Sequence, residues 1–482
     1  MIFKVLFAFM FPTIAGFLFV IYYFRSYKDG NIFENIMFGY GIGMGFVTLV
    51  MFFLGLLHIR FSLSVILIPL VAAICFLSYL IFTSKTAFRD MLFPKYFQGN
   101  STPEKNFSWK KRAVIVFFSA WLLLKFSFVI HEGLILPIHA WDSWVNWSSG
   151  AKFFFYEKGL VLDPSDEHFF GWGMRLFLNY PLHDFLIQVW FSLCMGHFDE
   201  IYVKFWNVLY FLTTVGILYF SVRRESSVLI AILSAFFLSS APLFTYHALD
   251  AYADLTLGYY NLAAAVCFWR YIEAIERGAP QRNGFLLFMG IFTALTLWTK
   301  QEGLLTTLSL SVSVILLHII KKIPYRNLLF FLMPVAIVAV PWYVFLYSYH
   351  IPLFGRGERF LDSGMHLEIF SSLANQIFLF PNFNIIFVVF IVILLLGYRI
   401  IFRSGLKYLL TALFCILSMF IFIYIATKDY KYALDLTGIN RNILPLLPMI
   451  YYISALTVSR LLQDLTKDKK KIESREADAY LA

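Results

Sequence analysis

The feature that most constrains this chain is the repetition of apolar runs long enough to cross a bilayer. Stretches of roughly 18 or more apolar residues, the length that a membrane-spanning helix needs, recur from one end of the 482 residues to the other. The composition is 60% hydrophobic and only 14% charged, whereas a soluble protein carries about 25% charged residues. The chain is therefore expected to be an all-α polytopic membrane protein.

Hydropathy, combined with the positions of the basic loops, predicts about thirteen transmembrane helices. The first run has no small-residue cleavage site after it, so it is interpreted as a first helix and not as a signal peptide. The expected spans are 1–24, 36–57, 61–83, 113–130, 201–222, 227–245, 255–273, 285–299, 303–320, 328–346, 383–398, 408–426 and 442–459.

The formal charge of +10 is explained by where the basic residues lie. Lys and Arg concentrate in alternate loops, which is the positive-inside pattern of cytoplasmic loops and not a nucleic-acid-binding surface. The lysine cluster at 467–471 places the C-terminus in the cytoplasm, and an odd number of spans then places the N-terminus outside. The four cysteines stand singly in apolar stretches and are expected to be small buried residues.

Three segments are expected along the chain. Residues 1–112 would form N-terminal helices and a basic cytoplasmic loop, and 113–346 a catalytic transmembrane module that includes a large outside loop at 131–200. Residues 347–482 would form the C-terminal helices with outside loops at 347–380 and 427–442 and a basic tail. Within the first loop, 181–196 is apolar but too short to cross and return, which predicts a helix along the membrane surface with Trp190 as an anchor.

The second span contains glycines at 39, 41, 43 and 45, which give two overlapping GxxxG spacings. Such spacings allow close contact between helices. They are expected to serve packing within this chain.

The first polar patch on the outside follows the fourth span. Asp142 stands there among Trp141, Trp144 and Trp147. Tryptophans at this depth either anchor the protein at the interface or present ring faces on which a sugar could stack. An anchor belt needs no carboxylate, and an ionisable group this close to hydrocarbon usually has a function.

The second patch opens the span at 255–273. Asp250 and Asp254 are four residues apart, so on a helix they would share one face. A helix N-terminus favours negative charge, which is a structural reason for one of them. Two acids with a nearby histidine also suggest a wall that binds an acceptor or a metal.

Two further patches carry cations. Lys300 and Glu302 lie at a tight turn between two apolar runs, where they either cap a helical hairpin as an ion pair or offer Lys300 to a lipid phosphate. Arg441 begins the last span, where it either extends toward water or holds a phosphate with two parallel hydrogen bonds.

At these patches the chain resembles the GT-C superfamily of integral-membrane glycosyltransferases, in particular the bacterial branch akin to protein O-mannosyltransferases and the lipid A aminoarabinose transferase. The matching strings lie within 113–460: AWDSWVNWSSGAKFF, NYPLHDFLIQVW, YADLTLGYY, TKQEGLL and NRNILPLLP. The chain departs from the family where Ser143 follows Asp142 in place of a second acid, and where Asn179 replaces an acid. Four spans also precede the signature loop instead of one.

The resemblance implies a polyprenyl-phosphate-linked sugar as donor and transfer with inversion at the anomeric carbon. Asp142 would then be the catalytic base, and the phosphate-binding cations would be Lys300, Arg441, Lys152 and Arg175. The residues Trp141, Trp144, Trp147, Asp250, Asp254 and Glu302 would bind sugar or acceptor. A divalent metal is left open, with Asp166, Glu167 and His168 as candidate ligands, because their spacing matches no recognised pattern.

The expected location is the inner membrane, with the active site facing the periplasm or cell exterior, and the expected acceptor is a lipid, glycan or protein. Two other functions remain. A flippase or transporter of lipid-linked sugars would need charged residues lining a pathway near the midplane. A ligase or polymerase of O-antigen would be expected to show an arginine-rich outside loop, of which Arg356 and Arg359 are a faint sign.

Overall fold

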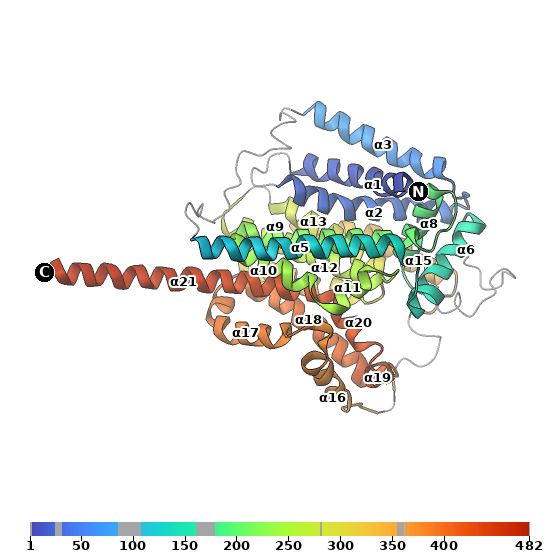
Figure 1. Cartoon of the computed structure of the whole chain (residues 1–482). Helices are drawn as coiled ribbons and strands as arrows, with labels where there is room; N and C mark the ends of the chain where they lie inside the picture. Colours follow the sequence, from blue (N-terminus) through green and yellow to red (C-terminus); the bar gives the residue numbers. More distant parts are fainter. Residues whose placement is uncertain are drawn as a thin grey trace.

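A computed structural model describes residues 2–24, 31–84, 108–160, 179–279, 282–353, 361–362 and 364–481, the last fifteen of them by backbone alone. These residues form helices, and the extended structure among them is a single bridge between Leu361 and Thr427. The long helices run side by side across the view of Figure 1. The short helices α6, α8 and α19 gather at the end of the bundle that faces away from the C-terminus.

The helices of the N-terminal half are α1 (Ile2–Tyr23), α2 (Ile32–Leu56), α3 (Leu63–Phe82), α5 (Trp109–Ile135), η1 (Ser143–Ser148), α6 (Ser149–Glu157), α8 (His183–Met195), η2 (Tyr202–Lys204), α9 (Phe205–Glu225), α10 (Val228–Ser239) and α11 (Pro242–Ala248). Those of the C-terminal half are α12 (Ala253–Glu276), α13 (Arg282–Thr299), α14 (Gly303–Lys321), η3 (Tyr325–Leu328), α15 (Leu329–Ser348), α16 (Ile369–Ala374), η4 (Asn375–Leu379), η5 (Pro381–Phe383), α17 (Ile386–Arg403), α18 (Leu406–Ala426), α19 (Tyr430–Leu434), α20 (Ile439–Ile443), η6 (Leu444–Leu446) and α21 (Leu447–Leu481).

The all-α membrane class is confirmed, but the count of thirteen spans is not. Among the described residues ten helices are long and apolar enough to cross a membrane, and the pair α10 and α11, bent by 70°, raises the number to eleven. The remaining two expected spans are α12 and α13, which exist as helices but are less apolar. Both are buried among other helices, so they need no lipid-facing surface and can carry polar side chains.

Close packing of α1 on α2 depends on glycine, as expected from the GxxxG spacing. A Cβ atom on Gly16 would lie 2.0 Å from the carbonyl oxygen of Gly39, and one on Gly43 would lie 1.8 Å from that of Pro12. Two further glycines of α2 face the centre of the protein, where Gly41 meets the Tyr259 ring and Gly45 meets Leu295. The glycines therefore let α2 approach α1, α12 and α13 at once.

Replacing Gly43 by alanine should separate α1 from α2 and destabilise the protein. The added methyl group would meet backbone, which cannot move aside as a side chain can, and overpacking of this kind typically costs about 1–3 kcal/mol. Gly284→Ala is the matched control, because its Cβ would lie 3.7 Å from its nearest neighbours. Thermal unfolding in detergent should show a lower midpoint for Gly43→Ala alone; equal midpoints would contradict the packing.

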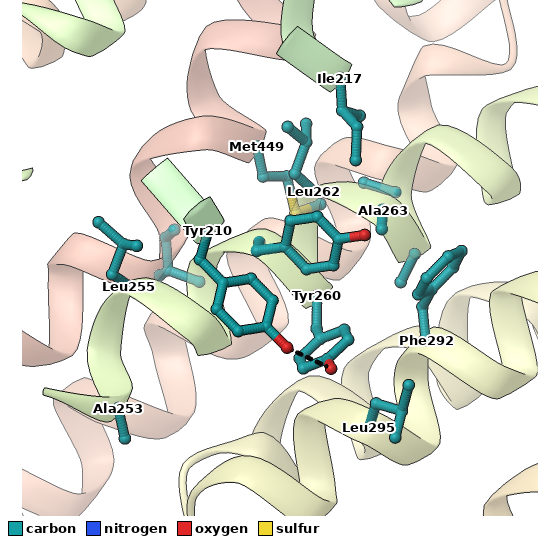
Figure 2. Close-up of a cluster of buried hydrophobic side chains, with 14 of the residues drawn as sticks. Tyr210, Ile217, Ala253, Leu255, Tyr260, Leu262, Ala263, Phe292, Leu295 and Met449 are labelled. Atoms are coloured by element: carbon teal, nitrogen blue, oxygen red, sulfur yellow. Dashed lines mark hydrogen bonds between the residues drawn. The ribbon is translucent and has the colours of Figure 1, made fainter. Parts of the chain in front are cut away.

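A buried polar network joins the helices at the centre of the bundle. The hydroxyls of Tyr210 (α9) and Tyr260 (α12) lie 2.8 Å apart (Figure 2). The Tyr260 hydroxyl also lies 3.1 Å from His183 Nε2, and His183 Nδ1 is 2.8 Å from the Thr48 hydroxyl of α2. Trp298 of α13 donates to the same hydroxyl at 3.0 Å. The network therefore fixes the start of α8 against four long helices.

The segment at 181–196 is a helix, as predicted, but it does not lie on a surface. Nearly every side chain of α8 is buried, and Trp190 donates from Nε1 to the carbonyl oxygen of Ala8 in α1 at 2.6 Å. The expectation that Trp190 is an interfacial anchor is therefore wrong. The polar side chains of α8 are also enclosed: Gln188, for example, accepts a hydrogen bond from Ser148 at 2.8 Å. The helix therefore has no face suited to water.

Candidate active site

Asp254 is the centre of a cluster of charged residues at the end of the bundle. Its side chain is completely buried, and Lys300 Nζ donates to Oδ1 at 2.8 Å. Arg441 donates to Oδ2 from Nε at 3.3 Å and from Nη2 at 3.2 Å. His247 Nδ1 approaches the same oxygen to 3.5 Å. The second and the last two predicted patches thus meet at one carboxylate.

Each member of the cluster stands where a long helix begins or ends. Asp254 is in the first turn of α12, where the helix dipole favours a negative charge. Lys300 lies in the turn between α13 and α14, and that turn needs Gly303, whose Cβ would lie 2.0 Å from the carbonyl oxygen of Thr296. Arg441 is on the short helix α20, just before the last span. These residues are far apart in sequence, but they meet because their helices begin or end at the same end of the bundle.

Asp142 joins the cluster through Arg441. Arg441 Nη1 bonds to Asp142 Oδ2, and Asn146 donates to Oδ1 at 3.1 Å. The guanidinium group lies 4.7 Å from the centre of the Tyr252 ring. The Asp142 side chain is 31% exposed and that of Arg441 is 21% exposed, so a ligand can reach both. Arg441 thus bridges an accessible carboxylate and a buried one.

Lys300 and Asp254, which are both buried, keep each other in the charged form. Burial alone would lower the pKa of Lys300, but the carboxylates of Asp254 and Glu302 outweigh this effect and hold that pKa well above its usual value. Burial alone would raise the pKa of Asp254, but Lys300 and Arg441 hold it below its ordinary range. Glu302 pairs with Lys300 at 2.8 Å. Lys300 is therefore a permanent cation behind Arg441.

Asp250 does not share a helix face with Asp254. The helix α12 begins at Ala253, so the four-residue spacing falls on the turn before it and the prediction of a common face is wrong. The buried carboxylate of Asp250 accepts from the backbone N–H of Ala140 at 2.7 Å and of His139 at 3.3 Å. It also lies 3.0 Å from His139 Nδ1. Asp250 therefore fastens the segment that precedes Asp142.

Two buried residues that the sequence patterns did not single out form hydrogen bonds with the turn that precedes α12. Lys204 Nζ donates to the carbonyl oxygen of Leu249. Asn207 donates from its side chain to the carbonyl oxygens of Asp250 at 2.6 Å and Tyr252 at 2.8 Å. The sequence signal for these two residues was a lysine and an asparagine inside an otherwise apolar stretch. Buried polar groups of this kind need hydrogen-bond partners inside the protein.

Asp250→Ala should loosen the segment before Asp142. The variant leaves the N–H groups of the buried Ala140 and of the more exposed His139 without their carboxylate acceptor, and an unsatisfied buried donor costs about 1–3 kcal/mol. Hydrogen–deuterium exchange should become faster at these two amides and stay unchanged in α18. Asp250→Asn keeps an acceptor oxygen and serves as the control. Unchanged exchange in the alanine variant would show that Asp250 does not hold this segment.

The three tryptophans beside Asp142 divide into two groups. Trp141 is 72% exposed and Trp144 is 56% exposed, so their ring faces are free to contact a ligand. Trp147 is buried, with its ring centre 5.0 Å from that of Phe185 and 5.4 Å from that of Tyr180. Trp147 is a packing residue, and the expectation that it contacts a sugar is wrong.

Of the remaining predicted residues the structure describes Lys152, which does not join the cluster. Lys152 pairs with Glu200 at 3.3 Å, and both side chains are well exposed. The predicted residues Arg175, Asp166, Glu167, His168, Arg356 and Arg359 lie outside the described part of the chain. Within the described part, three or more His, Cys, Asp or Glu side chains nowhere gather closely enough to hold a metal ion.

A second buried acid near the cluster was not predicted. Asp184, on α8, is completely buried, and neither of its oxygens has a hydrogen-bond partner among the described residues. Burial, reinforced by the charge of Asp254, raises its pKa well above the usual value. The sequence gave no sign that Asp184 is buried, because the segment around it was expected to lie along the membrane surface.

Comparison with known proteins gives a match in structure alone. No family model matches the chain, and no curated protein matches it in sequence. The chain is similar to the crystal structure of ArnT from Cupriavidus metallidurans bound to undecaprenyl phosphate, with 13% identity, a TM-score of 0.50 and coverage of 72% of this chain. The apo structure of the same ArnT gives 13% identity, a TM-score of 0.49 and the same coverage of 72% of this chain.

The match spans 60% of the length of the ArnT chain. At 13% identity it concerns the fold alone, and it agrees with the helical architecture. The chain therefore has a fold similar to that of ArnT.

Proposed function

We propose that this protein is an inverting glycosyltransferase that moves a monosaccharide from a polyprenyl-phosphate donor to an envelope acceptor. The observation that carries the proposal is the bridge made by Arg441 between the accessible Asp142 and the buried Asp254, with Lys300 behind it. A base and a phosphate-binding cation then stand side by side at the end of the bundle. The likeness to ArnT, whose crystal structure contains undecaprenyl phosphate, supports this choice of donor.

Arg441 is the residue that meets the donor phosphate. Its guanidinium group is partly exposed and presents the planar fork of donors that phosphate prefers. Lys300 is buried, so it acts from behind: through Asp254 it helps to hold Arg441 in place and adds positive charge near the leaving group. The departing phosphate is a stable anion, and it needs this positive charge more than it needs an acid.

Asp142 is the base in this proposal. The acceptor oxygen attacks the anomeric carbon, the bond to the phosphate oxygen breaks with its electron pair, and the acceptor proton passes to Asp142. In the free protein the Asp142 carboxylate is held by Arg441. A donor phosphate competes for the same guanidinium group, so donor binding frees the carboxylate for the acceptor.

The exposed indoles of Trp141 and Trp144 stand next to the base in sequence and are the candidate stacking surfaces for a sugar ring. The proposed acceptor is an envelope lipid, glycan or protein. A metal is not assigned to this mechanism, since the described residues offer no ligand group for one.

The orientation follows from the distribution of basic residues. The cluster lies where α14 begins and α12 begins, whereas the opposite ends of the helices carry basic groups such as Lys321, Arg277 and Arg403. The positive-inside rule assigns these basic ends to the cytoplasm. The proposed active site then faces the periplasm or the cell exterior. The same position at helix ends weighs against a transporter, whose site would lie near the midplane.

The test is transfer of radiolabelled sugar by membranes that contain the protein. We expect incorporation into an envelope fraction from polyprenyl-phosphate-linked sugars and none from nucleotide sugars, with membranes lacking the protein as control. Proteoliposomes that move a lipid-linked sugar across the bilayer without forming a glycosidic product would overturn the proposal in favour of a flippase.

A further inference from the structure

A cavity lined by charged residues lies at the opposite end of the bundle from Asp254. It has a volume of about 530 Å³ and is lined by residues of α9, α12, α17 and α21. Its lining includes Trp269 and Glu273 of α12, which follow Asp254 by 15 and 19 residues. At about 1.5 Å per residue these positions are roughly 22–28 Å along the helix from the proposed active site. This span approaches the roughly 30 Å hydrocarbon thickness of a bilayer, so the cavity lies at the level of the other layer of headgroups.

Three arginines converge on this cavity from two helices. Arg399 and Arg403 are four residues apart on α17 and so lie on one face of that helix. Arg460 comes from α21, and its guanidinium group lies 4.7 Å from the centre of the Trp269 ring. An arginine that merely extended toward water would not be packed on a buried indole. The packing holds Arg460 at the wall of the cavity.

The acids of the cavity do not neutralise these arginines. Glu225 pairs with Arg224 at 3.4 Å, and Glu273 pairs with Arg277 at 3.3 Å. Among the described residues, Arg399, Arg403 and Arg460 have no carboxylate within 4.0 Å, although the exposed Asp464 also lines the cavity. With Arg224 and Arg277 counted together with the lining, five arginines stand against three acids, so the region around the cavity carries an excess of positive charge.

Trp269 forms part of the wall of this site and lies beneath Arg460. Its side chain is buried at the wall of the cavity, and its indole N–H has no partner among the described residues. A buried donor without a partner is costly, and it is usually satisfied by a ligand or by water. The arginines that line the cavity point to an oxygen-rich anion as its ligand.

We propose that this cavity binds a phosphate group, carried by an anionic phospholipid headgroup or free in solution. Guanidinium groups bind phosphate oxygens with paired hydrogen bonds, and the volume of the cavity is in the range of small-ligand sites. The position at headgroup depth favours the phospholipid. The site is independent of the proposed transferase activity.

Binding to the purified full-length protein in neutral detergent tests this inference. Native mass spectrometry would count bound short-chain phosphatidylglycerol, with short-chain phosphatidylcholine and inorganic phosphate in separate titrations. We expect phosphatidylglycerol to bind better than phosphatidylcholine. The triple variant R399Q/R403Q/R460Q should lose at least about tenfold in affinity for the anionic ligand, as expected when charge-assisted hydrogen bonds are removed.

The matched control is K321Q/K322Q/R326Q, which removes three cations near the end of α14 and the start of α15 and should bind as the wild type does. An Arg→Lys triple variant at the cavity keeps the charge, and so it shows whether weaker binding reflects loss of charge or loss of folding. Binding of inorganic phosphate alone, with the same dependence on the arginines, would identify a soluble phosphate as the ligand. Equal affinity in wild type and R399Q/R403Q/R460Q, or no binding of either phosphate ligand to the wild type, would overturn the proposal.

Discussion

Asp142→Asn should abolish sugar transfer while leaving the protein folded. The asparagine side chain is nearly isosteric, and its one oxygen can take the place of the oxygen that accepts from Arg441 or of the one that accepts from Asn146, but it cannot take the acceptor proton. Loss of a general base typically lowers the rate by about 10²- to 10⁴-fold. The measurement is the initial rate of label incorporation from the polyprenyl-phosphate donor, at equal protein levels and with the unfolding midpoint recorded in parallel.

The matched control for this variant is Glu200→Gln. It removes an exposed carboxylate from the same outside loop and breaks a solvent-exposed pair with Lys152, which is worth little. We expect Glu200→Gln to keep wild-type rates. If Asp142→Asn transfers sugar as fast as Glu200→Gln, then Asp142 is not the base, even if the protein is a transferase.

Asp254→Asn should produce the largest loss of stability of any single substitution in the cluster. Among the described residues, the buried Lys300 would keep Glu302 alone as a carboxylate partner, and Arg441 would keep Asp142. Leaving a buried cation undercompensated is strongly destabilising, here by about 3 kcal/mol in the free energy of unfolding because some partners remain. Thermal or denaturant unfolding of the purified variant in detergent measures the loss.

Two further measurements separate the lost charge from a general packing defect. The double variant Asp254→Asn with Lys300→Met should recover part of the stability, because the uncompensated cation is gone. The folded-state pKa of Asp254 is held below its unfolded value of about 3.9, so its contribution to stability is present at neutral pH and is lost as the pH falls through the folded value. The gap between wild type and Asp254→Asn should therefore close in acid. A gap that is independent of pH would contradict the charge-based explanation.

The sequence predicts the positions of the helices well, because each span requires a long apolar run. The count was less secure, since α12 and α13 are enclosed by other helices and are free to be more polar than a lipid-facing span. The same enclosure explains α8: an apolar helix too short to cross the bilayer could lie on the surface or inside the protein, and the sequence does not record that its neighbours surround it. The burial of α8 and the hydrogen bond from Trp190 to α1 place this helix inside the protein.

The members of the proposed site were also predicted one by one, each from a local reason. Asp142, Lys300 and Arg441 were unusual charges beside apolar spans, and Asp254 stood at a helix start. What the sequence could not give was their meeting point, which depends on where four separate helices end. Asp250 illustrates the limit. One unpredicted helix boundary, at Ala253, turns its side chain away from Asp254 and toward the backbone of Ala140.

The most direct test of the account is the affinity of purified protein for undecaprenyl phosphate, compared among wild type, Asp142→Asn and Arg441→Gln. If Arg441 binds the donor phosphate and Asp142 competes for the same guanidinium group, Arg441→Gln should bind the lipid more weakly than wild type. Asp142→Asn should bind it at least as tightly as wild type, although it does not transfer sugar. Equal affinity in wild type and Arg441→Gln, or weaker binding in Asp142→Asn, would contradict the division of roles between phosphate-binding cation and base.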